Sequence, residues 1–403
     1  MRRRSFLKTG LAGAALATAA RGLPMRALAA IRANPELSPA REKTWPQLWV
    51  SGSHHDVGKA IGRAFGNDTR DALAARAAWF KPLFEYASSK DGKPVVDKML
   101  ATVKKHAGPA VEELQGWAEG AGMEFRELFV LNCKSEIEAF IESRCGCAGC
   151  TTAAYTDKNT LIVAHNEDGH MAYRGRMFIL DAEVPGVPQV LGFVYPGIMA
   201  GNAPWVNSEG ILMTTNYIPS AKVRAGIPRY FLDRMAMEAT SVEEAIRIVS
   251  HPERAYAFHH IVASLPQRRA WSVEGTPEKL VTKEVEGLYL HTNHLIREEM
   301  QDQPQFREYI ELSSKPRLNS VTMDLMKDGG KGTTAKDIMS AFTSHRGKPY
   351  SVCRHPEGEA TGATMGTALF QSREGDYQYT RPFTVDIWKG QPCRGKVSTY
   401  TVG

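Results

Sequence analysis

The pattern of apolar residues in this chain of 403 residues changes character near Cys150. Before Cys150, apolar residues recur at the spacing of amphipathic helices over residues 56–105, 112–119 and 125–131. Beyond it, alternation and turn residues predict strands over residues 161–165, 189–194, 210–216, 261–265, 270–274, 280–285, 365–371 and 376–380. A capping pattern at Ser241 and Glu244 predicts a further helix, and residues 334–342 predict another. Helices and strands in such blocks indicate an α+β fold, with helices packed on antiparallel sheets.

The helical pattern gives way to the strand pattern at a cysteine-rich motif, Cys145-Gly146-Cys147-Ala148-Gly149-Cys150-Thr151-Thr152. A thiol with an ordinary pKa of about 8.5 is mostly protonated at neutral pH and needs a base, and no well-placed histidine is evident near Cys150 in the sequence. If Cys150 became the first residue of a chain, its own α-amino group, with a pKa of about 7.7 to 8, would supply that base. Gly149 lacks a Cβ and tolerates the strained backbone that brings the Cys150 thiol onto the preceding carbonyl. Asp168, in the run Asn166-Glu167-Asp168, is the natural carboxylate to orient that amine or the adjoining backbone.

Other interpretations of these residues stay open. Cys145, Cys147 and Cys150 have the residue types of a zinc or iron–sulfur site, as in a metal-binding or redox protein. A fourth ligand would come from another cysteine, but none forms a second close pair in the sequence; the candidates are Cys133, Cys353 and Cys393. Asp168 could instead cap a turn, which is common for aspartate in Asn-x-Asp-Gly sequences.

Further motifs accompany the one at Cys150, in a fixed order. They are residues 114–122 and 127–132, the run from Gly201 to Asn216, residues 268–274 and the loop His291-Thr292-Asn293-His294-Leu295. With these motifs the chain resembles the isopenicillin N acyltransferase family (acyl-CoA:6-aminopenicillanic acid acyltransferases, peptidase family C45), a branch of the N-terminal nucleophile hydrolases. The resemblance implies a four-layer αββα sandwich with Cys150 at the start of an inner strand. It also implies autocatalytic cleavage of the bond between Gly149 and Cys150.

The same resemblance assigns an oxyanion-binding asparagine to the His-Thr-Asn-His loop, at Asn293. Negative charge develops on the substrate carbonyl oxygen during acyl transfer, and a fixed amide donor there is typically worth about 100-fold to 1,000-fold in rate. Asn216 is a second, weaker candidate, since asparagine at a strand end is usually structural. Arg354 is a candidate for binding a substrate carboxylate, with a surface salt bridge as the alternative. His291 and His294 have the spacing of metal ligands, but no acidic residue is near them in the sequence, so we expect no metal there.

The N-terminus has the features of a twin-arginine signal peptide. Arg3-Arg4-Ser5-Phe6-Leu7-Lys8 precedes an apolar run from Leu11 to Ala20 and an Ala27-Leu28-Ala29 cleavage pattern. The apolar run is shorter than the roughly 18 to 20 residues of a membrane-spanning helix, so we expect no integral membrane segment. All six charged residues up to Ala29 are basic, so the formal net charge of +6 falls to 6 − 6 = 0 in the mature chain. We therefore expect export to the periplasm by the twin-arginine machinery and no nucleic-acid partner.

Together these features predict a self-processing periplasmic cysteine amidohydrolase or acyltransferase. It would act on an N-acyl amide of a small molecule through a Cys150 thioester, without a cofactor or metal. We predict a signal peptide over 1–29, an N-terminal helical segment over 30–149 that becomes the α chain and stays bound, and a catalytic β chain over 150–403, together one domain. Cleavage does not need Cys145 or Cys147, which lie on the segment that it frees. An uncleaved relative that keeps the fold as a binding module is a further alternative.

Overall fold

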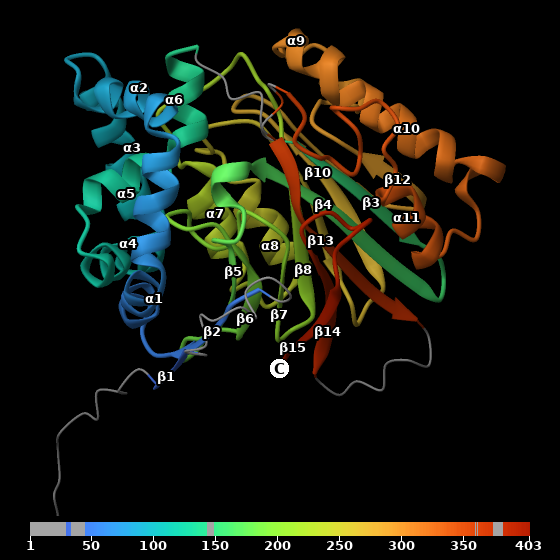
Figure 1. The fold of residues 1–403 in the computed structure, drawn as a ribbon, viewed down its shortest axis with the longest axis horizontal. Coiled ribbons are helices and arrows are strands. Elements are labelled where there is room, and N and C mark those ends of the chain that lie inside the picture. Colours follow the sequence, from blue (N-terminus) through green and yellow to red (C-terminus); the bar gives the residue numbers. More distant parts are fainter. Residues whose placement is uncertain (1–29, 34–44, 143–148, 359, 361, 374–381) are drawn as a thin grey trace, which may run out of the picture.

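The computed structural model describes residues 30–33, 45–142, 149–358, 360, 362–373 and 382–403. Two β-sheets lie face to face in its centre, and helices cover the outer side of each (Figure 1). Strand β3 of one sheet contacts β8 and β10 of the other, so the two inner faces form the middle of the molecule. This confirms the predicted α+β fold with four layers in the order α, β, β, α.

The larger sheet has nine strands. In spatial order they are β1 (Ala30–Ala33), β2 (Gln47–Ser51), β5 (Phe178–Glu183), β6 (Val190–Val194), β7 (Trp205–Asn207), β8 (Ile211–Tyr217), β9 (Phe258–Ser264), β10 (Arg269–Gly275) and β11 (Leu280–Glu284). All neighbouring strands are antiparallel except β2 and β5, which pair in parallel. The segment before Cys150, predicted to be helical, therefore also contributes two strands to this sheet.

The smaller sheet has six strands and carries the motif at Cys150. In spatial order they are β12 (Gly287–His291), β3 (Gly149–Thr156), β4 (Thr160–His170), β13 (Gly362–Arg373), β14 (Phe383–Lys389) and β15 (Val397–Val402). Buried residues run without interruption along β3, as expected for a strand covered on both faces. The strand predicted over residues 376–380 lies outside the described residues, and β14 and β15 were not predicted.

Helices of the N-terminal and middle parts of the chain cover the larger sheet. They are α1 (His54–Ala75), α2 (Ala77–Ser88), α3 (Gly92–His106), α4 (Gly108–Ala121), α5 (Phe125–Leu131), α6 (Lys134–Phe140), α7 (Arg229–Ala236) and α8 (Val242–Val249). The predicted start of α8 is confirmed, because the Ser241 side chain accepts a hydrogen bond from the Glu244 N–H. The Glu244 carboxylate, however, binds Thr240 rather than closing a capping box on Ser241.

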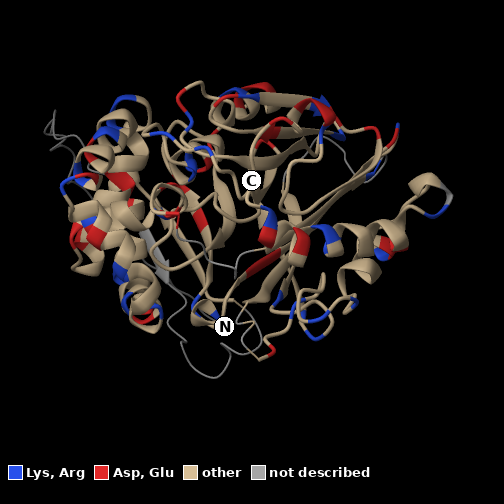
Figure 2. Ribbon diagram, turned by 90° about the horizontal axis from the view of Figure 1, so that it is seen from above, with Lys and Arg blue, Asp and Glu red and all other residues tan. Residues whose placement is uncertain are grey.

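Three helices of the C-terminal part cover the smaller sheet: α9 (Arg307–Tyr309), α10 (Lys315–Leu325) and α11 (Ala335–Phe342). Helix α10 contacts β12 and α11 contacts β4, which places both beside the strand that carries Cys150. Among the described residues, no helix is both long and apolar enough to cross a membrane. Figure 2 shows acidic and basic residues interspersed on the outer helices.

Candidate active site

Strand register decides which residues surround Cys150. On one side β4 pairs with β3, so that Glu167 lies opposite Cys150 and Asp168 lies opposite Gly149. On the other side β12 pairs with β3 as far as His291, which lies opposite Thr152. The same register, continued beyond the end of β12, brings Asn293 next to Cys150. Cys150 is therefore flanked by residues that are distant in the sequence, and only 7% of its surface is exposed.

Asn293 binds the backbone nitrogen of Cys150. The Cys150 N–H donates to Asn293 Oδ1 at 2.9 Å, and Arg317 Nη2 donates to the same oxygen at 2.6 Å. The Asn293 amide nitrogen donates to the Tyr217 carbonyl at 2.9 Å. The guanidinium fixes this orientation, because turning the amide would place two donors against each other. After cleavage the Cys150 nitrogen would be the α-amine, so this contact would hold the proposed base.

This geometry adds a second role to the one predicted for Asn293. Its oxygen accepts at the nucleophile residue and so orients the Cys150 nitrogen. One N–H of its amide donates to the Tyr217 carbonyl, and an oxyanion would use the other. The oxyanion role of Asn293 therefore stays a prediction beside the orienting role.

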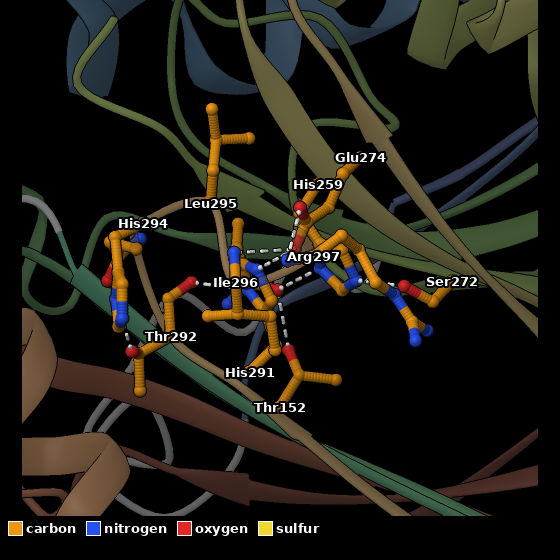
Figure 3. Close-up of polar contacts among 12 residues, drawn as sticks. Thr152, His259, Ser272, Glu274, His291, Thr292, His294, Leu295, Ile296 and Arg297 are labelled. Atoms are coloured by element: carbon orange, nitrogen blue, oxygen red, sulfur yellow. Dashed lines mark hydrogen bonds and ion pairs between the residues drawn. The ribbon is translucent and has the colours of Figure 1, made fainter. Parts of the chain in front are cut away.

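A network of buried side chains holds the loop that carries Asn293 (Figure 3). Ser314 Oγ accepts from the Asn293 N–H at 2.7 Å and contacts His294 Nδ1 at 2.7 Å. The Glu274 carboxylate contacts His291 Nε2 at 3.1 Å and accepts from the backbone N–H of Ile296 at 3.0 Å. His291 and His294 thus act as structural residues of the loop.

Glu167 is the carboxylate beside the nucleophile, and the sequence analysis gave it no role. Its Oε2 lies 3.7 Å from Cys150 Sγ and 3.0 Å from His165 Nε2, while Oε1 accepts from the Tyr195 hydroxyl at 2.8 Å. Residues directly opposite in an antiparallel pair point to the same face, which explains why Glu167 rather than Asp168 reaches the thiol. His165 lies two residues before Glu167 and shares that face. The structure therefore places a histidine near Cys150 that was not evident in the sequence, with its Nε2 in contact with Glu167.

Burial of the thiol and two nearby carboxylates both favour the protonated form of Cys150 in the continuous chain. Burial, followed by the negative charges of Glu167 and Asp168, raises the pKa of Cys150 well above its ordinary value. Arg317 acts in the opposite sense, and its Nη1 donates to the Cys150 carbonyl at 2.5 Å. A positive α-ammonium on Cys150 itself would add to the effect of Arg317, because an adjacent cation stabilises a thiolate.

Asp168 lies on the opposite face of β4 and meets Arg354. The Thr364 hydroxyl donates to Asp168 Oδ1 at 2.7 Å, and Arg354 Nε lies 3.6 Å from Oδ2. Burial raises the pKa of Asp168, and the charges of Arg354 and Arg317 oppose that rise. Asp168 therefore anchors an arginine beside the Gly149–Cys150 junction, whereas the backbone nitrogen of Cys150 is bound to Asn293.

Gly149 is required by close packing rather than by backbone strain. A Cβ on Gly149 would lie 2.8 Å from the Tyr309 hydroxyl, 3.0 Å from Arg354 Nη2 and 3.2 Å from Arg317 Nη2. The left-handed glycines of the described chain do not include Gly149, so the strain predicted for this residue is not present. Two guanidinium groups thus approach the junction from the side where other residues carry a side chain.

The two lower-ranked candidates, Arg354 and Asn216, are both buried. Arg354 is 1% exposed and donates to Ser313 Oγ at 2.8 Å, so the surface salt bridge considered for it is excluded. Asn216 Oδ1 accepts from the Thr152 hydroxyl at 2.9 Å, and this hydrogen bond links the two sheets. The same oxygen lies 3.1 Å from His259 Nδ1. Within the described part of the chain, the Asn216 amide nitrogen has no hydrogen-bond partner.

A narrow cleft of about 80 Å³ opens onto Cys150. Its walls carry aromatic side chains, among them Trp79, Tyr217 and Tyr230, together with the cations Arg76, Lys134 and Arg229. A larger cavity of about 460 Å³ lies between Trp45 and the turn that follows β14, and it does not include Cys150. We take the narrow cleft as the substrate site, because it contains the thiol and both neighbouring carboxylates.

Cys145 and Cys147 lie outside the described residues. Cys353 and Cys393 lie close to two histidines and not to Cys150, whereas Cys150 lies close to His165 and Glu167.

The sequence contained no signal for Arg317 or Tyr195, which reach the site from α10 and from the loop after β6. Glu167 could have been found by extending the strand alternation across the hairpin from Cys150.

Comparisons with known proteins give one family and several distant relatives. The family model described as acyl-coenzyme A:6-aminopenicillanic acid acyl-transferase matches residues 155–382, a range that begins after Cys150. A β-alanyl-dopamine/carcinine hydrolase of Drosophila melanogaster is 24% identical over 256 residues, which cover 59% of this chain and 66% of the fly protein. The match thus spans just under two thirds of the length of that relative.

The 40 kDa form of an acyl-coenzyme A:6-aminopenicillanic-acid acyltransferase of Emericella nidulans is 28% identical over 298 residues. These cover 71% of this chain and 80% of the fungal protein. A crystal structure of a mutant conjugated bile acid hydrolase from Clostridium perfringens aligns with a TM-score of 0.36 and 11% identity, covering 62% of this chain and 97% of that one.

Proposed function

The chain belongs to the acyl-coenzyme A:6-aminopenicillanic acid acyl-transferase family, whose model matches more than half of it, and on this premise we propose that it is a self-processing cysteine amidohydrolase or acyltransferase. Its substrate would be an N-acyl amide of a small molecule. The observation that carries the proposal is the contact at 2.9 Å between the Cys150 nitrogen and Asn293, beside a thiol that opens onto a cleft. A nucleophile and its base would then sit on one residue once the bond to Gly149 is cut.

Processing would begin in the continuous chain. The Cys150 thiol loses its proton and attacks the Gly149 carbonyl, and the peptide C–N bond breaks as the nitrogen of Cys150 takes up a proton. Glu167, whose Oε2 lies 3.7 Å from Sγ, is the carboxylate placed to accept the thiol proton. Water then hydrolyses the Gly149 thioester, which releases the new Gly149 carboxylate and returns the thiol of Cys150 beside its free α-amine.

Turnover would use the same atoms on a substrate. The α-amine takes the proton of the thiol, and the thiolate attacks the acyl carbonyl. The protonated amine then gives its proton to the leaving nitrogen, which leaves an acyl thioester on Cys150. Arg317 and Asn293 would fix the amine during both proton transfers, since Asn293 Oδ1 contacts both the Cys150 nitrogen and Arg317.

Release of the acyl group to water is the route that we favour. One relative is named as a hydrolase and another as an acyltransferase, so the family name alone does not decide between them. The signal-like N-terminus supports export to the periplasm by the twin-arginine route, where water is abundant and acyl-coenzyme A is not expected. The aromatic and cationic walls of the cleft suit a small acyl amide that carries an apolar or anionic group.

Cys150→Ala tests the proposal most directly. The variant should remain one chain and should have no amidase activity, because it lacks the attacking sulfur for both steps. Intact-mass measurement of the purified protein would detect cleavage, and Cys150→Ser should cut slowly because an alcohol ionises less readily than a thiol. Cys133→Ala is the matched control, since Cys133 is also buried but lies outside the cleft. Normal splitting of Cys150→Ala would rule out self-processing by this residue.

A further inference from the structure

A second group of cysteine and histidine side chains lies apart from Cys150. It is formed by His345 just after α11, Cys353 and His355 in the segment that leads to β13, and Cys393 in the turn between β14 and β15. One ligand atom from each of these residues lies within 4.8 Å of all the others. Three separate segments of the chain therefore converge on one point.

The distances within this group match the edges of a tetrahedron around a metal ion. Metal–ligand bonds of about 2.05 Å to nitrogen and 2.3 Å to sulfur give edges of about 3.3 Å between two nitrogens and about 3.6 Å between nitrogen and sulfur. His355 Nε2 lies 3.2 Å from His345 Nε2, 3.3 Å from Cys393 Sγ and 3.7 Å from Cys353 Sγ. All three distances agree with these edges within a few tenths of an ångström.

Hydrogen bonding cannot account for this convergence. An imidazole nitrogen carries either one hydrogen or one lone pair in the ring plane, so it serves one partner well. His355 Nε2 has three partners at these distances, and each of them also points inward. A cation at the centre would use the lone pairs of all four residues at once.

We propose that His345, Cys353, His355 and Cys393 bind a structural zinc ion. Two thiolates and two imidazoles in tetrahedral arrangement are the ligand set of closed zinc sites, and they leave no position for a substrate. Cys353 is fully buried while His345 is exposed, so an ion can enter from solvent.

The zinc ion would brace the segment that holds Arg354. Cys353 and His355 flank this residue, whose backbone N–H donates to the Thr364 hydroxyl at 2.9 Å and whose guanidinium faces Asp168. Fixing both neighbours would hold Arg354 against the Gly149–Cys150 junction. The role is one of positioning, and the site is separate from the proposed chemistry at Cys150.

Metal analysis of the full-length protein tests this proposal. Protein purified without chelator and dialysed against metal-free buffer should keep about one zinc per chain, the stoichiometry of one closed site. Cys393→Ser and His355→Ala should retain nearly none. Cys133→Ser, a buried cysteine outside the group, and Cys150→Ala should both keep their zinc. Because the readout is metal content, the result does not depend on the proposed amidase activity.

A second measurement covers variants that fail to fold. Removing zinc from the wild-type protein with a chelator should expose two further thiols to a thiol reagent and lower its melting temperature, and adding zinc back should reverse both changes. A wild-type protein that stays metal-free after incubation with zinc would overturn the proposal. A disulfide between Cys353 and Cys393 in a non-reduced digest of the purified protein would overturn it equally.

Discussion

Replacement of Asn293 by alanine should damage the site through three lost hydrogen bonds. Oδ1 accepts from the Cys150 N–H and from Arg317, and Nδ2 donates to the Tyr217 carbonyl. A neutral bond contributes about 1 kcal/mol and a bond to a charged group about 1.5 to 3 kcal/mol, which gives a total of about 3.5 to 5 kcal/mol of folding stability. If the α-amine also loses its orientation as a base, kcat/KM should fall by about 100-fold to 10,000-fold.

Asn293→Asp distinguishes the two roles considered for this residue. Aspartate keeps an acceptor for the Cys150 nitrogen and Arg317 but cannot donate a hydrogen bond when ionised. If Asn293 orients the amine, the aspartate variant should be more active than the alanine variant. An oxyanion donor predicts the reverse order, because a carboxylate would repel the developing negative charge.

The assay compares kcat/KM of both variants on a chromogenic N-acyl amide that the wild type hydrolyses, after intact mass has shown how much protein is cut. Melting temperatures report folding separately. Asn159→Ala, in the exposed turn after β3, is the matched control. A cut and folded aspartate variant that is less active than the alanine variant would refute the orienting role, and full activity of both would remove Asn293 from the site.

Two further predictions concern the thiol and the segment before it. Glu167→Gln removes a negative charge that raises the pKa of Cys150, so the pH midpoint for alkylation of the cut enzyme should move down while cleavage of the precursor slows. An unchanged midpoint, measured with iodoacetamide across pH, would contradict the electrostatic argument. Changing both Cys145 and Cys147 to Ser should leave cleavage and turnover largely intact, because neither thiol lies on the new N-terminal residue. Loss of stoichiometric metal together with activity in that double variant would favour the metal-binding interpretation of the cysteine motif.

Much of the fold follows from local patterns. Helices α1 to α5 and strands β4, β6, β8, β9 and β10 have apolar spacings that predicted them, whereas α6 was not predicted. Thr334 begins the predicted helix α11 with a complete capping box. Of the strands that escaped prediction, β7 is short and β15 lies at a sheet edge, whereas β5 and β14 are interior strands of six and seven residues. The parallel pairing of β2 with β5 joins residues more than a hundred positions apart, so no local pattern could indicate it.

The identity of several site residues was also predictable from local motifs, whereas their roles were not. Cys150, Asp168 and Asn293 stand in motifs, and the structure brings all three to one end of β3. Their roles depend on which face of a strand each side chain occupies. Strand alternation turns Glu167 toward the thiol and Asp168 toward Arg354, which the motif alone did not reveal.

The sequence by itself determined the position of the candidate nucleophile, the α+β class and the family, because these depend on residue types in a fixed local order. Tertiary structure alone decided what surrounds that nucleophile. Arg317 reaches Cys150 from α10, Tyr195 reaches Glu167 from beyond β6, and the group around His355 joins three segments. These contacts depend on strand register and on the packing of distant elements, whose free energy comes from burial over the whole core rather than from any local preference.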